Sequence, residues 1–266
     1  MTNSGANTSG AYTGRTEYEA IGGAYGRTRR PDSRIGLRIR AALGDARTVV
    51  NVGAGIGAYE PDDLEVTAVE PAAAMMAARP PAAAQCVLAA AESLPFADAS
   101  FDAAMGVLTL HHWTDVAAGL GELRRVARRR VVLLTWDPEF NDTLWLTTDY
   151  LPVIRARDRA IFPTLPTILR GLEPCRGSII EPVPVAHDCS DGFLGAWWRR
   201  PAAYLDPVVQ TGISSFCELG PAVLDSPLAR LAADLESGEW RRRFGHLLEL
   251  DELDLGYRLV TAILEG

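Results

Sequence analysis

Apolar residues gather in five short, nearly continuous runs over the first half of the chain. Three are rich in valine, at 48–54, 65–71 and 130–138, and two less regular runs lie at 85–91 and 101–108. Runs of this length without polar alternation are typical of strands in a parallel sheet that is buried on both faces. The pattern therefore predicts five strands, each ending at turn residues.

Between these runs the apolar spacing changes to that of a helix. Ile35, Ile39 and Leu43 recur every four residues, and the stretches 72–79 and 115–127 are also compatible with helices. Strands that alternate with helices predict an α/β fold with a mostly parallel sheet. In such folds ligands bind beyond the carboxyl ends of the strands, so the residues that follow each strand are the candidates for chemistry.

After residue 138 this alternation stops. The segments 139–176 and 187–255 are richer in proline, leucine and aromatic residues, and we predict that they form a partly helical cap that binds substrate. Residues 177–186 and 256–266 are β-rich and predict a sixth and a seventh strand. Together with residues 18–138 these strands would form the core, a seven-stranded sheet with helices on both faces.

Composition narrows the possible partners. With 48% hydrophobic and 23% charged residues, the chain resembles soluble globular proteins, and its net charge of −8 argues against a nucleic-acid partner. No apolar run reaches the ~18 residues that span a bilayer. Residues 1–17 lack the regions of a signal peptide and predict a disordered leader. The four scattered cysteines predict reduced thiols and a cytoplasmic location. We expect the protein to be a monomer or a homodimer.

The sequence VVNVGAGIGAYE, residues 49–60, begins in the first predicted strand and fits two glycine motifs. Gly53, Gly55 and Ala58 fit the dinucleotide pattern G-x-G-x-x-G/A, whereas Gly53, Gly55 and Gly57 fit the G-x-G-x-G of methyltransferases. Both need a tight turn and a backbone that a ligand can approach closely. Both also require an acid at the end of the second strand, where Glu70 lies. The glycines alone leave an NAD-dependent oxidoreductase and a methyltransferase as alternatives.

Later motifs separate the alternatives. AESLPF at 91–96, FD at 101–102 and LTLHHW at 108–113 follow in order, and YGRTRRP at 25–31 precedes the first strand. With the glycines and the acid, this order resembles the class I S-adenosylmethionine-dependent methyltransferases, specifically the small-molecule group near the ubiquinone/menaquinone type. One departure is Asn51, where many members of the family carry aspartate.

The resemblance implies a Rossmann-like fold and S-adenosylmethionine as cofactor, with S-adenosylhomocysteine as product. It implies methyl transfer to an oxygen, nitrogen or nucleophilic carbon of a small molecule, such as a secondary metabolite. Glu70 would bind both ribose hydroxyls, and Arg30, or in competition Arg29, would bind the carboxylate. The residues implied around the cofactor are Tyr25, Arg30, Gly53, Ala54, Gly55, Glu70, Pro71, Met75, Ala91, Glu92, Leu108 and Thr109.

Three histidines are candidates for a general base. His111 and His112 follow the fourth strand, and because neighbouring side chains there tend to point apart, we expect at most one to face the acceptor. His112 is the preferred choice, with a hydrogen-bonded structural histidine as an equal alternative. His187 with Asp188 is either a base with its orienting carboxylate or a pair that stabilises the cap. The histidines lack the spacing of a helical metal site, so we expect no metal.

Aromatic residues are candidates for the substrate site. We predict that Trp145, Tyr150 and Trp197 of the cap, together with Tyr18, line it, although each of the cap residues is also a good core residue. A further alternative from another functional class keeps the cofactor pocket without methyl transfer. Such a protein would be a binding protein, or a cyclase that uses the pocket as a shaped cavity.

Overall fold

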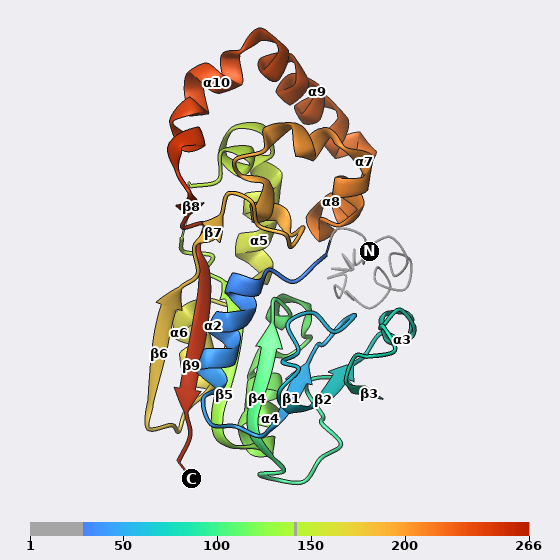
Figure 1. Cartoon of the computed structure of the whole chain (residues 1–266), viewed down its shortest axis with the longest axis vertical. Helices are drawn as coiled ribbons and strands as arrows, with labels where there is room; N and C mark the ends of the chain where they lie inside the picture. Colours follow the sequence, from blue (N-terminus) through green and yellow to red (C-terminus); the bar gives the residue numbers. More distant parts are fainter. Residues whose placement is uncertain (1–28, 141–142, 266) are drawn as a thin grey trace, which may run out of the picture.

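The computed structural model describes residues 29–140 and 143–265, and a seven-stranded sheet forms its core (Figure 1). The strand order is β3-β2-β1-β4-β5-β9-β6, and β9 runs antiparallel to both of its neighbours while all other pairs are parallel. This confirms the predicted Rossmann-like class. The strands are β1 (Thr48–Val52), β2 (Glu65–Glu70), β3 (Gln85–Leu88), β4 (Phe101–Val107), β5 (Ala127–Trp136), β6 (Gly177–Pro182) and β9 (Tyr257–Ile263).

The direction in which strands are added reverses between β1 and β4. From β1 the chain adds β2 and β3 on one side, then returns to place β4 on the other, where Val49 pairs with Ala103 and Asn51 with Met105. At such a switch point the loops after two neighbouring strands diverge and leave a crevice. The carboxyl ends of β1 and β4 therefore set the position of the site.

Helices cover both faces of the sheet. On one face lies α2 (Ser33–Leu43), whose predicted apolar stripe is buried. On the other face α4 (Val116–Val126) packs against β4 and β5, and α6 (Leu165–Gly171) packs against α4. The short helix α3 (Ala73–Ala77) follows β2. Aspartate side chains cap α2 and α4 by accepting hydrogen bonds from backbone N–H groups of the first turn.

Two boundaries differ from the sequence prediction. Although α6 lies inside the predicted cap segment 139–176, Ile168 and Leu172 are buried with the α4 side of the core. The second half of that segment thus covers the sheet. The sixth strand ends at Pro182, and β7 (Val185–Ala186) pairs instead with β8 (Glu252–Leu253) in a separate two-stranded sheet.

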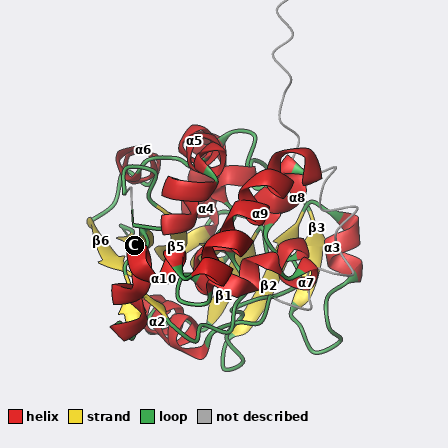
Figure 2. Ribbon diagram, turned by 90° about the horizontal axis from the view of Figure 1, so that it is seen from above, coloured by secondary structure: helices red, strands yellow, loops and turns green. Residues whose placement is uncertain are grey.

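The cap lies beyond the carboxyl ends of the parallel strands, and the view from above shows its helices in front of the sheet (Figure 2). A cluster of buried aromatic rings fills its interior, including Trp145, which packs edge-to-face on Trp240 at 5.3 Å. In the described part of the chain, no helix has the length and apolarity that crossing a membrane requires. The cap elements are η2 (Leu146–Tyr150), α5 (Pro152–Ile161), η3 (Leu194–Trp197), η4 (Pro201–Leu205), α7 (Pro207–Thr211), α8 (Ser214–Leu219), α9 (Pro221–Ser237), α10 (Glu239–Phe244) and η5 (Gly245–Glu249).

Candidate active site

Two adjoining cavities lie at the carboxyl ends of the strands. The larger, of about 380 Å³, is lined by the loops that follow β1, β2, β3 and β4, and we call it the strand-end cavity. The smaller, of about 110 Å³, lies between the sheet and the cap, and we call it the cap cavity. Arg29, Leu108 and His112 line both. These three residues therefore mark a junction at which two bound molecules can meet.

The glycine loop after β1 needs glycine for two separate reasons. Gly53 has a φ of +71°, in the left-handed region that favours glycine, and a Cβ atom there would lie 1.9 Å from Oγ1 of Thr109. Gly55 also has a positive φ, of +52°. The loop can thus turn sharply and bring its backbone against Thr109, which also lines the strand-end cavity.

Glu70 ends β2 and its carboxylate lies in the wall of the strand-end cavity. One oxygen accepts a hydrogen bond from the backbone N–H of Gly55 at 2.8 Å, and the other from that of Ala72 at 3.0 Å. Burial raises the pKa of this carboxyl, while the two backbone donors oppose the rise. Each oxygen has a further lone pair, so the carboxylate can hold the loop and still accept hydrogen bonds from a ligand.

A buried ion pair fixes the glycine loop from behind and accounts for Asn51. Nη2 of Arg79 lies 2.7 Å from Oε1 of Glu60, and Nη1 of Arg79 donates to the carbonyl of Gly55 at 3.0 Å. The amide of Asn51 donates to the same Glu60 oxygen at 3.2 Å. An aspartate at position 51 would place a second carboxylate against Glu60, which costs free energy in a buried site. An amide avoids this repulsion.

Most of the predicted cofactor residues are brought together. Ten of the twelve line the strand-end cavity: Gly53, Ala54, Gly55, Glu70, Pro71, Met75, Ala91, Glu92, Leu108 and Thr109. Glu92 also has a structural contact, since its Oε1 accepts hydrogen bonds from the backbone N–H groups of Thr114 and Asp115 at 2.7 and 3.1 Å. Its carboxylate therefore fixes the start of α4 at the edge of the cavity.

The remaining two predicted cofactor residues precede α2. Tyr25 lies outside the described residues. Arg30 is exposed and lines neither cavity, whereas its predicted competitor Arg29 lines both. Nε of Arg29 lies 2.6 Å from Oδ1 of Asp191, which holds the guanidinium at the junction. The structure thus places Arg29 where the prediction favoured Arg30.

Leu108 directly follows β4 and has an unusual backbone. Its φ is +50°, although leucine is not a residue that favours the left-handed region. Such a conformation costs of the order of 1–3 kcal/mol and is concentrated at functional sites. The backbone N–H of Leu108 donates to the carbonyl of Leu134 at 2.8 Å, which ties the turn to β5. This turn brings the backbone of residues 108–109 to the junction.

His111 and His112 lie side by side, so the expectation that their side chains point apart was wrong. Their ring centroids are 3.8 Å apart, and both line the cap cavity. The physical reason is that they belong to η1 (Leu110–His112), a 3-10 helix with three residues per turn, and not to an extended strand. Burial lowers the pKa of both, that of His112 to about 4. Both rings are therefore neutral near pH 7.

His187, the third predicted base, lies away from both cavities. It is absent from their linings, and its backbone N–H donates to the carbonyl of Asp251 at 2.8 Å. Its neighbour Asp188 forms an ion pair with Arg34 at 2.7 Å. The His187-Asp188 pair thus connects the cap to α2 and is no candidate for chemistry at these cavities.

The predicted substrate aromatics also line neither cavity. Trp145 is buried in the cap, where its Nε1 donates to the carbonyl of Trp198 at 2.7 Å, and the hydroxyl of Tyr150 donates to Asp234 at 2.7 Å. Trp197 packs under the guanidinium of Arg200, at 4.3 Å. Trp145 and Tyr150 are core residues of the cap, and Trp197 is a half-buried residue that packs against the same core. Tyr18 lies outside the described residues.

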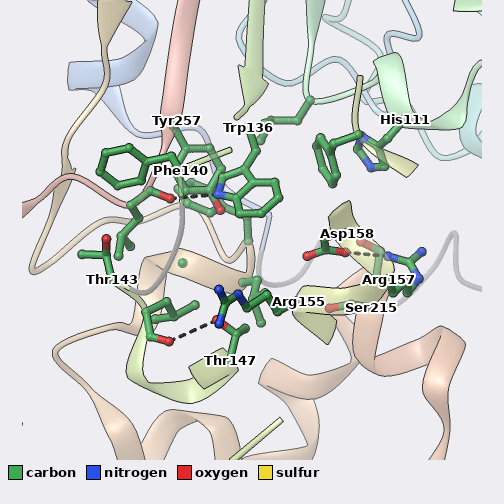
Figure 3. Close-up of a pocket in the computed structure, with 18 of the residues that line it drawn as sticks. His111, Trp136, Phe140, Thr143, Thr147, Arg155, Arg157, Asp158, Ser215 and Tyr257 are labelled. Carbon is green, nitrogen blue, oxygen red and sulfur yellow. Dashed lines mark hydrogen bonds and ion pairs between the residues drawn. The ribbon is translucent and has the colours of Figure 1, made fainter. Parts of the chain in front are cut away.

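Other residues, which the prediction missed, line the cap cavity (Figure 3). Trp136, Phe140 and Tyr257 supply aromatic walls, and Arg155, Arg157 and Asp158 supply charge. The sequence held a signal for the charged side, because Arg155, Asp158 and Phe162 have the spacing of one face of a helix. Among the described residues, no group of His, Cys, Asp and Glu side chains is arranged to hold a metal ion.

Comparison with known proteins identifies a methyltransferase family. A family described as "Methyltransferase domain" matches residues 50–135. The solved structure of a proposed methyltransferase from an antibiotic biosynthesis pathway of Anabaena variabilis is 34% identical, with a TM-score of 0.83, over 90% of this chain and 100% of that one.

Two further matches are more distant. A geranyl diphosphate C-methyltransferase of Streptomyces coelicolor, solved with S-adenosyl-L-homocysteine, shares the fold at 16% identity and a TM-score of 0.51, over 88% of this chain and 79% of that one. YafE, an uncharacterized protein of Escherichia coli K12, is 45% identical over 47 residues, which is 18% of this chain and only 23% of YafE.

Proposed function

Because the chain belongs to the class I S-adenosylmethionine-dependent methyltransferases, we propose that it methylates a small molecule bound in the cap cavity. The observation that carries this proposal is the junction. The strand-end cavity and the cap cavity adjoin at Arg29, Leu108 and His112. A methyl donor in the first cavity and an acceptor in the second can therefore react without crossing solvent.

The residues of the strand-end cavity suit the donor. Small and apolar side chains such as Ala54 and Met75 give room for a nucleoside, and Glu70 offers carboxylate oxygens to ribose hydroxyls. Arg29 provides a guanidinium suited to the carboxylate of the methionyl part. Bound there, S-adenosylmethionine would supply an electrophilic methyl group on a sulfonium centre. The backbone of Leu108 and Thr109 would border that centre.

The contribution of the protein to this reaction is mainly positional. The electrophile is already activated, so the enzyme must hold the acceptor atom in line with the methyl group and exclude water. The cap cavity suits both tasks, because aromatic rings line it and it adjoins the junction. Neutral His111 and His112 can donate or accept hydrogen bonds there without adding a positive charge near a cationic donor.

We further propose that the acceptor is a secondary metabolite. The aromatic walls of the cap cavity suit a flat or apolar molecule, with Trp136 and Tyr257 among them. The relative from Anabaena variabilis, described as part of an antibiotic biosynthesis pathway, supports the same class. The proposed acceptor is thus a conjugated small molecule.

Binding and turnover experiments test the function. In isothermal titration we expect S-adenosylhomocysteine to bind and NADH not to bind, and binding of NADH alone would support the oxidoreductase alternative. Turnover is then followed as S-adenosylhomocysteine formed from a panel of phenols, amines, thiols and carbon acids. If the cofactor binds but no acceptor yields product, the chain would be better described as a cyclase or a binding protein.

A further inference from the structure

Asp158 is the one carboxylate in the wall of the cap cavity among the described residues. It lies on α5, and its side chain is only 14% exposed. Oδ1 accepts a hydrogen bond from Nη1 of Arg157 at 2.9 Å, while Oδ2 has no hydrogen-bond partner in the described part of the chain. Figure 3 shows this carboxylate directed into the space between Trp136 and Ser215. The cavity therefore offers an accepting oxygen to whatever it holds.

Packed rings connect α5, the helix that carries Asp158, to the junction of the cavities. Phe162 lies one turn further along, and its backbone N–H donates to the carbonyl of Asp158 at 2.9 Å. The Phe162 ring stacks on His111 at 4.0 Å, and His111 contacts His112 at 3.8 Å. Because His112 lines both cavities, α5 is held at a fixed position relative to the expected methyl group.

We propose that Asp158 is the general base of the reaction and that the acceptor is an aromatic hydroxyl compound. This rests on the proposed methyl transfer. The hydroxyl proton passes to the Asp158 carboxylate as an oxygen lone pair forms the new O–C bond to the methyl carbon. The C–S bond breaks and its electron pair stays on sulfur, leaving a neutral thioether. Asp158 then releases the proton to water.

The surroundings of Asp158 suit a general base better than the surroundings of His112 do. Burial raises the pKa of Asp158 to about 6, whereas burial lowers that of His112 to about 4, so the Asp158 carboxylate is the stronger base of the two. The charged and titratable groups that line the cavity with Asp158 are Arg29, Arg155, Arg157, His111, His112 and Tyr257. The pKa of Tyr257 is raised by burial and by Asp158. Glu218 on α8 forms an ion pair with Arg157.

The same charges favour an oxygen nucleophile over a protonated amine. Arg29, Arg155 and Arg157 all line the cap cavity. Arg29 and Arg157 are held in ion pairs with Asp191 and Glu218. Guanidinium N–H groups are hydrogen-bond donors only, so they suit a hydroxyl oxygen that loses its proton and cannot accept a hydrogen bond from an ammonium group. Aromatic walls add a preference for a flat ring. The acceptor class that fits is therefore a phenol or an enol of a conjugated ring.

Two phenols of different acidity test the base directly. At pH about 8, 4-nitrophenol is largely ionised and needs no base, whereas 4-methoxyphenol keeps its proton. We expect Asp158→Asn to lower kcat with 4-methoxyphenol by about 10²–10⁴-fold, the usual effect of losing a general base. With 4-nitrophenol we expect a loss of less than about tenfold. The lower limb of the kcat/KM pH profile should also disappear with 4-methoxyphenol.

Controls separate chemistry from folding. Asp225→Asn makes the same change at an exposed position of cap helix α9 and should leave both rates unchanged. The dissociation constant of S-adenosylhomocysteine should be the same for Asp158→Asn and the wild type. Equal losses with both phenols, or no loss with either, would overturn the role of Asp158.

Failure of this inference is distinguishable from failure of methyl transfer. If the wild type forms S-adenosylhomocysteine from an amine or a carbon acid but methylates neither phenol, the acceptor class and the base are wrong while the methyltransferase function stands. If no acceptor of any class yields S-adenosylhomocysteine, the proposed function itself fails and this inference fails with it.

Discussion

Replacing Glu70 by alanine is the sharpest perturbation of the strand-end cavity. The substitution removes the carboxylate that accepts hydrogen bonds from the backbone N–H groups of Gly55 and Ala72, at 2.8 and 3.0 Å. It also removes the oxygens proposed to bind the ribose hydroxyls. One change should therefore weaken both the loop and the binding of the cofactor, and the two effects can be measured separately.

The magnitudes follow from these contacts. Loss of a charged hydrogen-bond partner typically costs about 1–3 kcal/mol, so the dissociation constant of S-adenosylhomocysteine should rise about 5- to 150-fold. The loss of folding free energy should be smaller than two full charged hydrogen bonds would suggest. Burial raises the pKa of Glu70, which shows that desolvation already offsets part of what these bonds contribute.

The assay is isothermal titration with S-adenosylhomocysteine, accompanied by urea unfolding. Glu65→Ala is the matched control, because Glu65 begins the same strand but is exposed. We expect it to leave binding unchanged. Glu70→Gln should fall between wild type and alanine, since the amide retains one accepting oxygen. An unchanged dissociation constant for Glu70→Ala would refute the assignment of this carboxylate to the cofactor.

Three further outcomes are expected. Gly53→Ala should weaken S-adenosylhomocysteine binding more than tenfold in titration, because the new Cβ has no space and the positive φ disfavours alanine. Gly121→Ala on α4 should leave this binding unchanged, because no atom lies within 4 Å of its new Cβ. Arg79→Met should lower the free energy of unfolding in urea by about 3–5 kcal/mol, because it leaves the buried Glu60 carboxylate without its ion-pair partner. Arg129→Met, which removes an exposed ion pair, should change the free energy of unfolding little. Folding raises the pKa of Asp158 from 3.8 to about 6, so the charged carboxylate destabilises the folded protein above pH about 6. Asp158→Asn should therefore raise the free energy of unfolding by up to about 3 kcal/mol at pH about 8. This gain should vanish below pH about 4, where aspartate is protonated in both the folded and the unfolded protein. A gain at low pH instead would contradict the sign.

The strands and the cofactor loop could be predicted because their signals are local. The apolar runs of β1 and β2 are each one continuous stretch of sequence. Gly53 directly follows β1 and Glu70 ends β2, and because these strands are parallel, the two residues lie at the same edge of the sheet. Local signals failed where packing decides. The α6 segment has ordinary helical composition, and only its contact with α4 assigns it to the core.

The cap cavity could not be predicted because it is assembled from distant segments. Trp136 ends β5, Asp158 lies on α5, and Tyr257 begins β9, more than a hundred residues from Trp136. Conversely, Trp145 and Tyr150 are residue types that are common in ligand pockets, yet here they fill the interior of the cap. Aromatic side chains suit both places, and sequence alone does not separate them.

A crystal structure with S-adenosylhomocysteine bound tests the central claim most directly. We expect the ribose on Glu70 in the strand-end cavity and the sulfur at the junction beside Leu108, facing the cap cavity. A cofactor that binds elsewhere, or a sulfur that faces away from the cap cavity, would contradict the account.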